Sequence, residues 1–255
     1  MEAESCKTCG LPIRAEGQFC VHCGVSRNGA TNLPSEANKP DHEHLVRENW
    51  KSFKGVMTLY GLFLFASLVF GFANHFSKHP ISTVIYWFVM LMVSLFYTYQ
   101  YRESVLVSFQ LPKMSFYKLA ELCLLAVVTY ILVDGYFSLF SVFKMPISRS
   151  STEYIKFGWP VWSIYFLVSL CPGIIEEIVF RGIIQTKLKE VLGWKEALII
   201  QAACFSILHL MPTIFISHFI MGLFAGWIRV RTSSVWPCMF VHMAWNAHVI
   251  FKELG

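Results

Sequence analysis

Long apolar runs constrain this chain more than any other feature of its sequence. A helix needs about 20 consecutive apolar residues to cross a membrane, and each run is long enough or nearly so. We therefore expect an all-α polytopic membrane protein with about seven transmembrane helices, in a range of six to eight. The runs lie near residues 56–74, 81–99, 116–143, 157–180, 196–211, 213–228 and 234–251.

Composition and charge agree with a chain that lives in lipid. Hydrophobic residues make up 55% of the sequence and charged residues only 15%, against roughly 25% in soluble domains. If the N-terminus is cytoplasmic, the helix ends that face the cytoplasm carry more Lys and Arg than the ends that face outward. This excess on the inside predicts a cytoplasmic N-terminus. The net charge of +5 comes without a basic stripe interleaved with aromatic residues, so no nucleic-acid partner is expected.

The N-terminus differs from the rest of the chain. Two CxxCG units supply four cysteines, Cys6, Cys9, Cys20 and Cys23. Four thiolates close a tetrahedral zinc site, and duplicated CxxC pairs followed by glycine resemble zinc ribbons, so residues 1–27 are predicted to bind a structural zinc. Disulfides and a redox CxxC are the alternatives, disfavoured by the predicted cytoplasmic location and by the duplication. A protein partner for this ribbon is a further expectation.

The sequence also suggests where these units separate. Residues 28–48 are polar, contain proline and glycine and show no apolar period, which is typical of a flexible linker. The multi-span domain is then expected to occupy residues 49–255.

Three ionisable residues interrupt the apolar run at 157–180 and its continuation. Each such group costs roughly 2.5–3.5 kcal/mol at the bilayer centre, so the default interpretation is a functional site. On a helix, Glu177 and Arg181 share a face and can pair, while Glu176 is turned about 100° away and remains available as a general base. A buried ion pair that only locks helices together is the alternative.

Further polar residues lie on the runs that follow. His209 ends a Phe-x-x-x-His motif, and His242 and Asn246 project from one helix face at i,i+4 spacing. Alone, each histidine would more often be a satisfied packing residue, but convergence on one wet site would resolve all of these buried polar groups together. Between them, Gly222 and Gly226 predict a close helix contact. His218, near the outer end of that span, is expected to be a residue of the membrane interface.

The ordered set EExxxR, FxxxH and HxxxN on successive apolar segments resembles the CAAX-protease and bacteriocin-processing (CPBP, Abi) family of intramembrane endopeptidases. The likeness covers residues 157–250. It implies hydrolysis of peptide bonds in membrane-associated or lipid-anchored peptides or proteins, with membrane lipid as surroundings. Carried over, Glu176 would activate a water, His209 would help to hold it, and His242 with Asn246 would stabilise the oxyanion. Glu177 and Arg181 would organise the site.

Other interpretations of the same residues remain open. Glu176, His209 and His242 could instead ligate a catalytic zinc with an open water position, as in a zinc-dependent CAAX-type metalloprotease; the version without a catalytic metal is favoured. A membrane scaffold or immunity protein would keep the polar cluster for folding alone, and a transporter would use the carboxylates as a proton relay. The absence of matching inverted halves weakens the transporter hypothesis.

One difficulty follows from helix lengths. With straight spans, Glu176 falls near the cytoplasmic end of its helix and His209 near the outer end of the next. Either a break at Pro172 and Gly173, or a continuation of the first helix through residues 183–195, would remove this conflict.

Overall fold

A computed structural model describes residues 42–77, 81–112, 114–142 and 150–254 of the chain. By internal contacts the chain divides into two units, Met1–Glu48 and Asn49–Gly255. The expected zinc ribbon at residues 1–27, with its four cysteines, lies outside the described residues. The first helix begins at His42, so the last residues of the expected linker are helical instead. No proline or glycine follows Pro40 until Gly55, so nothing in the sequence stops the helix from extending to His42.

Every regular element among the described residues is a helix. In chain order they are α1 (His42–Ser77), α2 (Ile81–Gln100), α3 (Arg102–Val105), η2 (Leu106–Phe109), α4 (Phe116–Val142), α5 (Ser150–Lys156), α6 (Val161–Tyr165), η3 (Phe166–Leu170), α7 (Cys171–Glu177), η4 (Ile178–Ile184), α8 (Gln185–Leu192), α9 (Trp194–Leu208), η5 (Pro212–Ile214), α10 (Phe215–Thr232) and α11 (Trp236–Leu254).

Each of the seven predicted apolar runs falls mostly on helix in the described residues, but the helices differ in their ability to cross a bilayer. Five segments are long and apolar enough to span a membrane: Val46–Ala73, Ile81–Gln100, Phe116–Leu139, Val161–Leu192 and Pro212–Thr232. At 15 residues, α9 is only about 22 Å long, less than a hydrocarbon core of about 30 Å. The fold is therefore an all-helical, multi-pass membrane protein with five candidate spans among the described residues.

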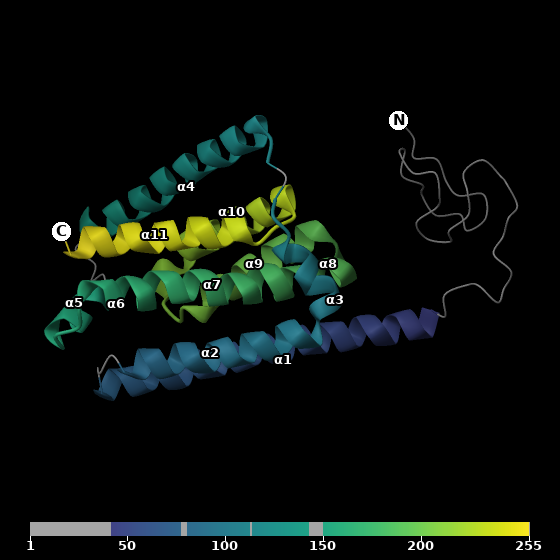
Figure 1. Ribbon diagram of the computed structural model, residues 1–255, viewed down its shortest axis with the longest axis horizontal. Coiled ribbons are helices and arrows are strands. Elements are labelled where there is room, and N and C mark those ends of the chain that lie inside the picture. Colours follow the sequence, from purple (N-terminus) through teal and green to yellow (C-terminus); the bar gives the residue numbers. More distant parts are fainter. Residues whose placement is uncertain (1–41, 78–80, 113, 143–149, 255) are drawn as a thin grey trace, which may run out of the picture. The chain divides into compact units, whose positions relative to one another are not determined.

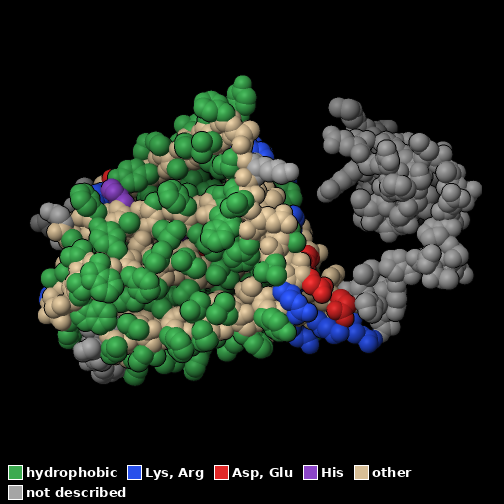
Figure 2. Space-filling model, in the orientation of Figure 1, with side chains coloured by type: hydrophobic (Ala, Val, Ile, Leu, Met, Phe, Trp, Pro, Cys, Tyr) green, Lys and Arg blue, Asp and Glu red, His purple; other side chains and the backbone are tan. Residues whose placement is uncertain are grey.

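The helix that carries the glutamates is the central one. In the most apolar window of Val161–Leu192, 67% of residues are buried, compared with 17–28% in the other four candidate spans. The exposed faces of α1, α2 and α4 carry large apolar side chains such as Phe65, Phe96 and Leu124. Figure 2 shows an almost continuous hydrophobic surface, with charged side chains gathered at the end where α1 begins. Such a surface suits contact with lipid rather than water.

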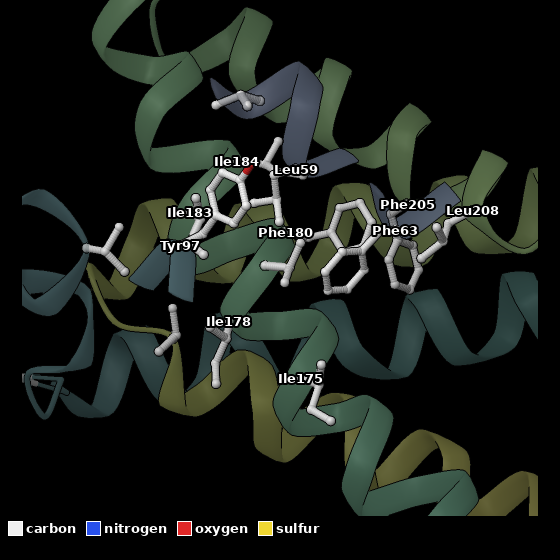
Figure 3. Packing of buried hydrophobic residues seen from close by; sticks show 14 of the residues in the cluster. Leu59, Phe63, Tyr97, Ile175, Ile178, Phe180, Ile183, Ile184, Phe205 and Leu208 are labelled. Carbon is white, nitrogen blue, oxygen red and sulfur yellow. The ribbon is translucent and has the colours of Figure 1, made fainter. Parts of the chain in front are cut away.

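Aromatic and β-branched residues build the core around this central helix. Phe63 of α1, Phe180 of η4 and Phe205 of α9 belong to one buried cluster (Figure 3), and the rings of Phe180 and Phe205 meet edge to face with centroids 5.3 Å apart. The α1 and α2 helices run alongside each other (Figure 1), and the hydroxyls of Ser67 in α1 and Tyr86 in α2 are hydrogen-bonded at 2.9 Å. Leu59 of α1 and Met90 of α2 also belong to the cluster.

The conflict over depth is resolved by the length of the central helix. Pro172 does not break this helix, which continues as α8 to Leu192. The chain then reverses direction at Gly193, which has a φ of 107°, a backbone conformation that glycine adopts readily and other residues rarely adopt. At 1.5 Å per residue, Glu176 lies about 25 Å before this turn and His209 about 24 Å after it. Because the two helices run antiparallel and pack together, the two residues reach similar depths.

Candidate active site

The two glutamates and the arginine lie where the central helix is locally widened. Glu176 and Glu177 end α7, and Arg181 lies within η4, a π-helical segment; a second π-helical segment, η3, precedes α7. Pro172 has no N–H to donate, and its ring would crowd the preceding turn of a regular helix, which a π turn there accommodates. Such insertions are frequent at functional sites.

A buried chain of charged groups connects this helix to α11. The guanidinium Nη1 of Arg181 lies 2.7 Å from Glu177 Oε1, and the same oxygen lies 2.8 Å from His242 Nδ1. Glu177 is 0% exposed and Arg181 1% exposed. The contact between Glu177 and Arg181 is the one that their i,i+4 spacing predicts. Glu177 therefore accepts hydrogen bonds from two donors at once, which fixes the orientation of the His242 ring.

Glu176 occupies the other side of His242. Its carboxyl is buried, and its Oε2 makes no hydrogen bond within the described residues. This oxygen lies 4.0 Å from His242 Nε2, too far for a direct hydrogen bond. The two glutamates thus differ as their spacing suggests: Glu177 is paired, and Glu176 is free to act on another molecule.

Small side chains bring α11 against α7. A Cβ atom at Gly173 would overlap the side chain of Met243 and approach its backbone, so only glycine fits this contact. One turn earlier, Ser169 Oγ donates a hydrogen bond of 2.7 Å to the Met243 carbonyl. These contacts lie next in sequence to His242 and hold it at the level of the glutamates.

The glycines of α10 allow it to pack closely against α9, the kind of close helix contact that the sequence predicts. A Cβ at Gly222 would lie 2.9 Å from Ala202 Cα, so α9 and α10 touch backbone to backbone there. The Gly222 carbonyl accepts hydrogen bonds from Gln201 Nε2 at 2.8 Å and from Arg181 Nη2 at 3.3 Å. Gln185 Nε2 donates to the carbonyl of Gly226 at 3.0 Å. Neither glutamine was expected from the sequence, where nothing distinguishes a buried amide from an exposed one.

His209 joins the site through aromatic contacts. The Phe205 ring packs against His209 at 5.0 Å and against His242 at 5.8 Å between centroids, and Arg181 Cζ lies 4.6 Å from the same ring. The Phe-x-x-x-His motif thus places its phenylalanine at the centre of the cluster. The ring centroid of His218 lies 4.0 Å from that of His209, a contact that the sequence did not predict.

Asn246 lies one turn beyond His242 on α11 and is half-buried. Its side chain makes no hydrogen bond to the rest of the described chain, which leaves the amide available to a ligand. His242 and Asn246 lie on the same face of α11, as their i,i+4 spacing predicts.

A cavity of about 560 Å³ opens beside these residues. Glu177, Arg181 and His242 form one part of its wall. The remainder is largely apolar and comes from α4, α10 and α11, including Leu122, Val127, Tyr130, Phe224, Val241 and Trp245. Ion pairs of Glu121 with Arg231 and of Asp134 with Lys252 connect α4 to α10 and α11.

The catalytic-zinc alternative requires three convergent ligands. Among residues 42–77, 81–112, 114–142 and 150–254, no three His, Cys, Asp or Glu side chains form a group that could hold a metal ion. Glu176, His209 and His242 therefore do not fit such a site in this arrangement.

Comparison with known families identifies the chemistry of this segment. Residues 158–248, which carry all six candidate residues, match the family model of type II CAAX prenyl endopeptidase Rce1-like. The chain is an intramembrane endopeptidase of the CAAX type. It is accordingly a peptide hydrolase, and the match supports the CAAX-protease resemblance of the sequence motifs. Among curated proteins and among solved structures, none matches the chain significantly.

Proposed function

We propose that this enzyme hydrolyses peptide bonds of membrane-associated or lipid-anchored peptides with a water that Glu176 activates. The supporting observation is the asymmetry of the two buried carboxylates around His242: Glu177 is bonded to Arg181 and His242, whereas Glu176 Oε2 lacks a partner 4.0 Å from His242 Nε2. One water bridges such a separation with hydrogen bonds of ordinary length. It would then touch both a base and an imidazole.

The proton balance of this mechanism needs no further reagent. Glu176 takes a proton from the water, and the water oxygen attacks the carbonyl carbon of the scissile bond, which converts the carbonyl oxygen to an oxyanion. When this intermediate collapses, the C–N bond breaks and Glu176 returns the proton to the leaving amine. The carboxylate ends as it began.

His242 and Asn246 stabilise the oxyanion in this proposal. Because Glu177 accepts from Nδ1, a His242 protonated on both nitrogens has Nε2–H left to donate to the oxyanion. The Asn246 amide, on the same face, supplies a second donor. Positioned donors of this kind contribute about 2.7–4 kcal/mol each in a site that excludes water. Arg181 and Glu177 organise the ring, and His209 helps to hold the attacking water.

The cavity supports a substrate with a hydrocarbon portion. Its wall is apolar along α4, α10 and α11 and reaches the ion pair and His242 at one part. Burial of a lipid chain contributes about 0.8 kcal/mol per CH₂, enough for several methylenes to anchor a peptide beside Glu177, Arg181 and His242.

The N-terminal region completes the proposal. Residues 1–27 form a ribbon in which Cys6, Cys9, Cys20 and Cys23 hold a structural zinc, on the support of the duplicated CxxCG spacing. The ribbon lies in the cytoplasm, as the distribution of Lys and Arg favours, and docks a protein partner. In this arrangement α11 and the shorter α9, whose ends a locally thinned bilayer accommodates, join the five candidate spans to give seven.

Substitution of Glu176 by Gln tests the mechanism directly. Gln keeps the shape and removes the base, so turnover of a membrane-peptide library should fall by about 10²–10⁴-fold or below detection while the protein remains folded. Glu190→Gln is the matched control, because Glu190 lies on the same helix but outside the site and should retain wild-type turnover. Undiminished cleavage by the Glu176 variant would remove this residue from the mechanism.

A further inference from the structure

His218 is the one histidine of the cluster that the mechanism above does not use. It is the fourth residue of α10 and lies nine residues after His209 in the sequence. Between the two histidines, the chain reverses direction through Leu210 and η5. Leu210 has a φ of 55°, and Ser206 Oγ donates a hydrogen bond of 2.5 Å to the Phe215 carbonyl across the turn. The turn is thus fastened in the conformation that brings the two rings together.

The two imidazoles are anchored in the same way. His209 Nδ1 lies 2.9 Å from the Phe205 carbonyl oxygen, and His218 Nδ1 lies 3.0 Å from the Ile214 carbonyl oxygen, in each case four residues earlier. A carbonyl oxygen only accepts, so each Nδ1 carries the proton. In a neutral ring, Nε2 is then an acceptor.

Neither Nε2 makes a hydrogen bond with any part of the chain that the structure describes. Both rings pack on Phe205, with centroid separations of 5.0 Å for His209 and 6.1 Å for His218. The same phenylalanine contacts His242, so all three imidazoles surround one ring. The two imidazoles are therefore in the same tautomer and lie together at the edge of the catalytic cluster, with their ring centroids 4.0 Å apart.

We propose that His218 is a further active-site residue, which acts with His209 as a pair of imidazole acceptors that hold the attacking water. This inference rests on the proposed hydrolysis. A water gives one proton to Glu176 and has a second O–H that needs an acceptor while the oxygen attacks. Two imidazoles with ring centroids 4.0 Å apart offer that O–H two acceptors, which restricts rotation of the water more than one acceptor would.

Three substitutions at His218 separate this role from simple packing. Phe keeps a ring against His209 but has no acceptor, Gln keeps an acceptor oxygen near the position of Nε2, and Ala keeps neither. A neutral hydrogen bond made in the transition state is worth about tenfold in rate. We expect kcat about tenfold lower in His218→Phe and His218→Ala, KM within about twofold, and a smaller loss in His218→Gln.

The controls distinguish failure of this inference from failure of the function. If wild-type protein cleaves membrane peptides and His218→Phe retains full kcat, the ring serves packing and the inference is wrong, whereas the function stands. If wild-type protein cleaves none, the function fails and the inference with it. A double variant with His209→Ala adds a further check: the two losses should be less than additive, and full additivity would show that the imidazoles act independently.

Discussion

Removal of the buried arginine should destabilise the enzyme far more than loss of an exposed one. Arg181 is 1% exposed and is the cationic partner of Glu177, which is 0% exposed. In Arg181→Ala, Glu177 keeps only His242, and its carboxylate becomes an incompletely compensated buried charge. Breaking a buried pair in this manner costs about 3–5 kcal/mol. The guanidinium also loses its packing on Phe205 and its bond to the Gly222 carbonyl.

This cost is measurable as a shift of the melting temperature in detergent. By the scaling of soluble domains of 150–250 residues, 1 kcal/mol corresponds to about 2–4 °C, so Arg181→Ala should melt roughly 6–20 °C lower than wild type. Arg231→Ala is the matched control. Arg231 also pairs with a glutamate, Glu121, but its side chain is 40% exposed, and solvent screens such pairs so that they contribute little to stability.

A charge-neutral double variant tests the physical reason. Glu177→Gln combined with Arg181→Met removes both charges, so most of the lost stability should return while activity remains low. If Arg181→Ala melts within about 2 °C of wild type, or if the double variant is no more stable than the single one, the uncompensated-charge argument is refuted.

Two further predictions concern helix packing and metal. Gly222→Ala should lower folded yield and stability by about 1–3 kcal/mol because its Cβ would lie 2.9 Å from the Ala202 backbone, whereas Gly61→Ala, with nothing within 4 Å, should be neutral or stabilising in the same melting assay. If the ribbon alone holds zinc, elemental analysis should find about one zinc per chain, lost on deletion of residues 1–40 while cleavage persists. Stoichiometric zinc lost in His209→Ala would instead establish the metalloprotease alternative.

Local spacing accounts for the parts of the site that were predictable from sequence. The contact of Glu177 with Arg181 and the shared face of His242 and Asn246 depend only on helix periodicity, which sequence reports directly. The close approach at Gly222 is also visible, because only a missing Cβ permits it. The location of His218 beside His209 depends on how tightly the turn between α9 and α10 closes. Periodicity contains no signal for that.

Hydropathy alone does not predict the length of the central helix. Hydropathy marks where a chain becomes polar, and it does so near Gln185, yet the helix continues to Leu192 because residues 185–192 contain neither glycine nor proline. Gly193 then provides the turn. Only this polar extension places His209 opposite Glu176, so the site is assembled by residues that a hydropathy profile assigns to a loop.

The buried polar residues around the site differ in whether their side chains bind a neighbouring helix. Arg181 and Gln201 both donate to the carbonyl of Gly222, and Gln185 donates to the carbonyl of Gly226. These side chains therefore connect neighbouring helices to α10. Glu176 makes no comparable bond in the described part of the chain, although burial of a carboxylate without a partner costs several kcal/mol. A residue that served only packing would relieve that cost through a neighbouring donor. In the proposed mechanism the Glu176 carboxyl meets a water instead of a protein donor, as a base that takes a proton from water in every cycle requires.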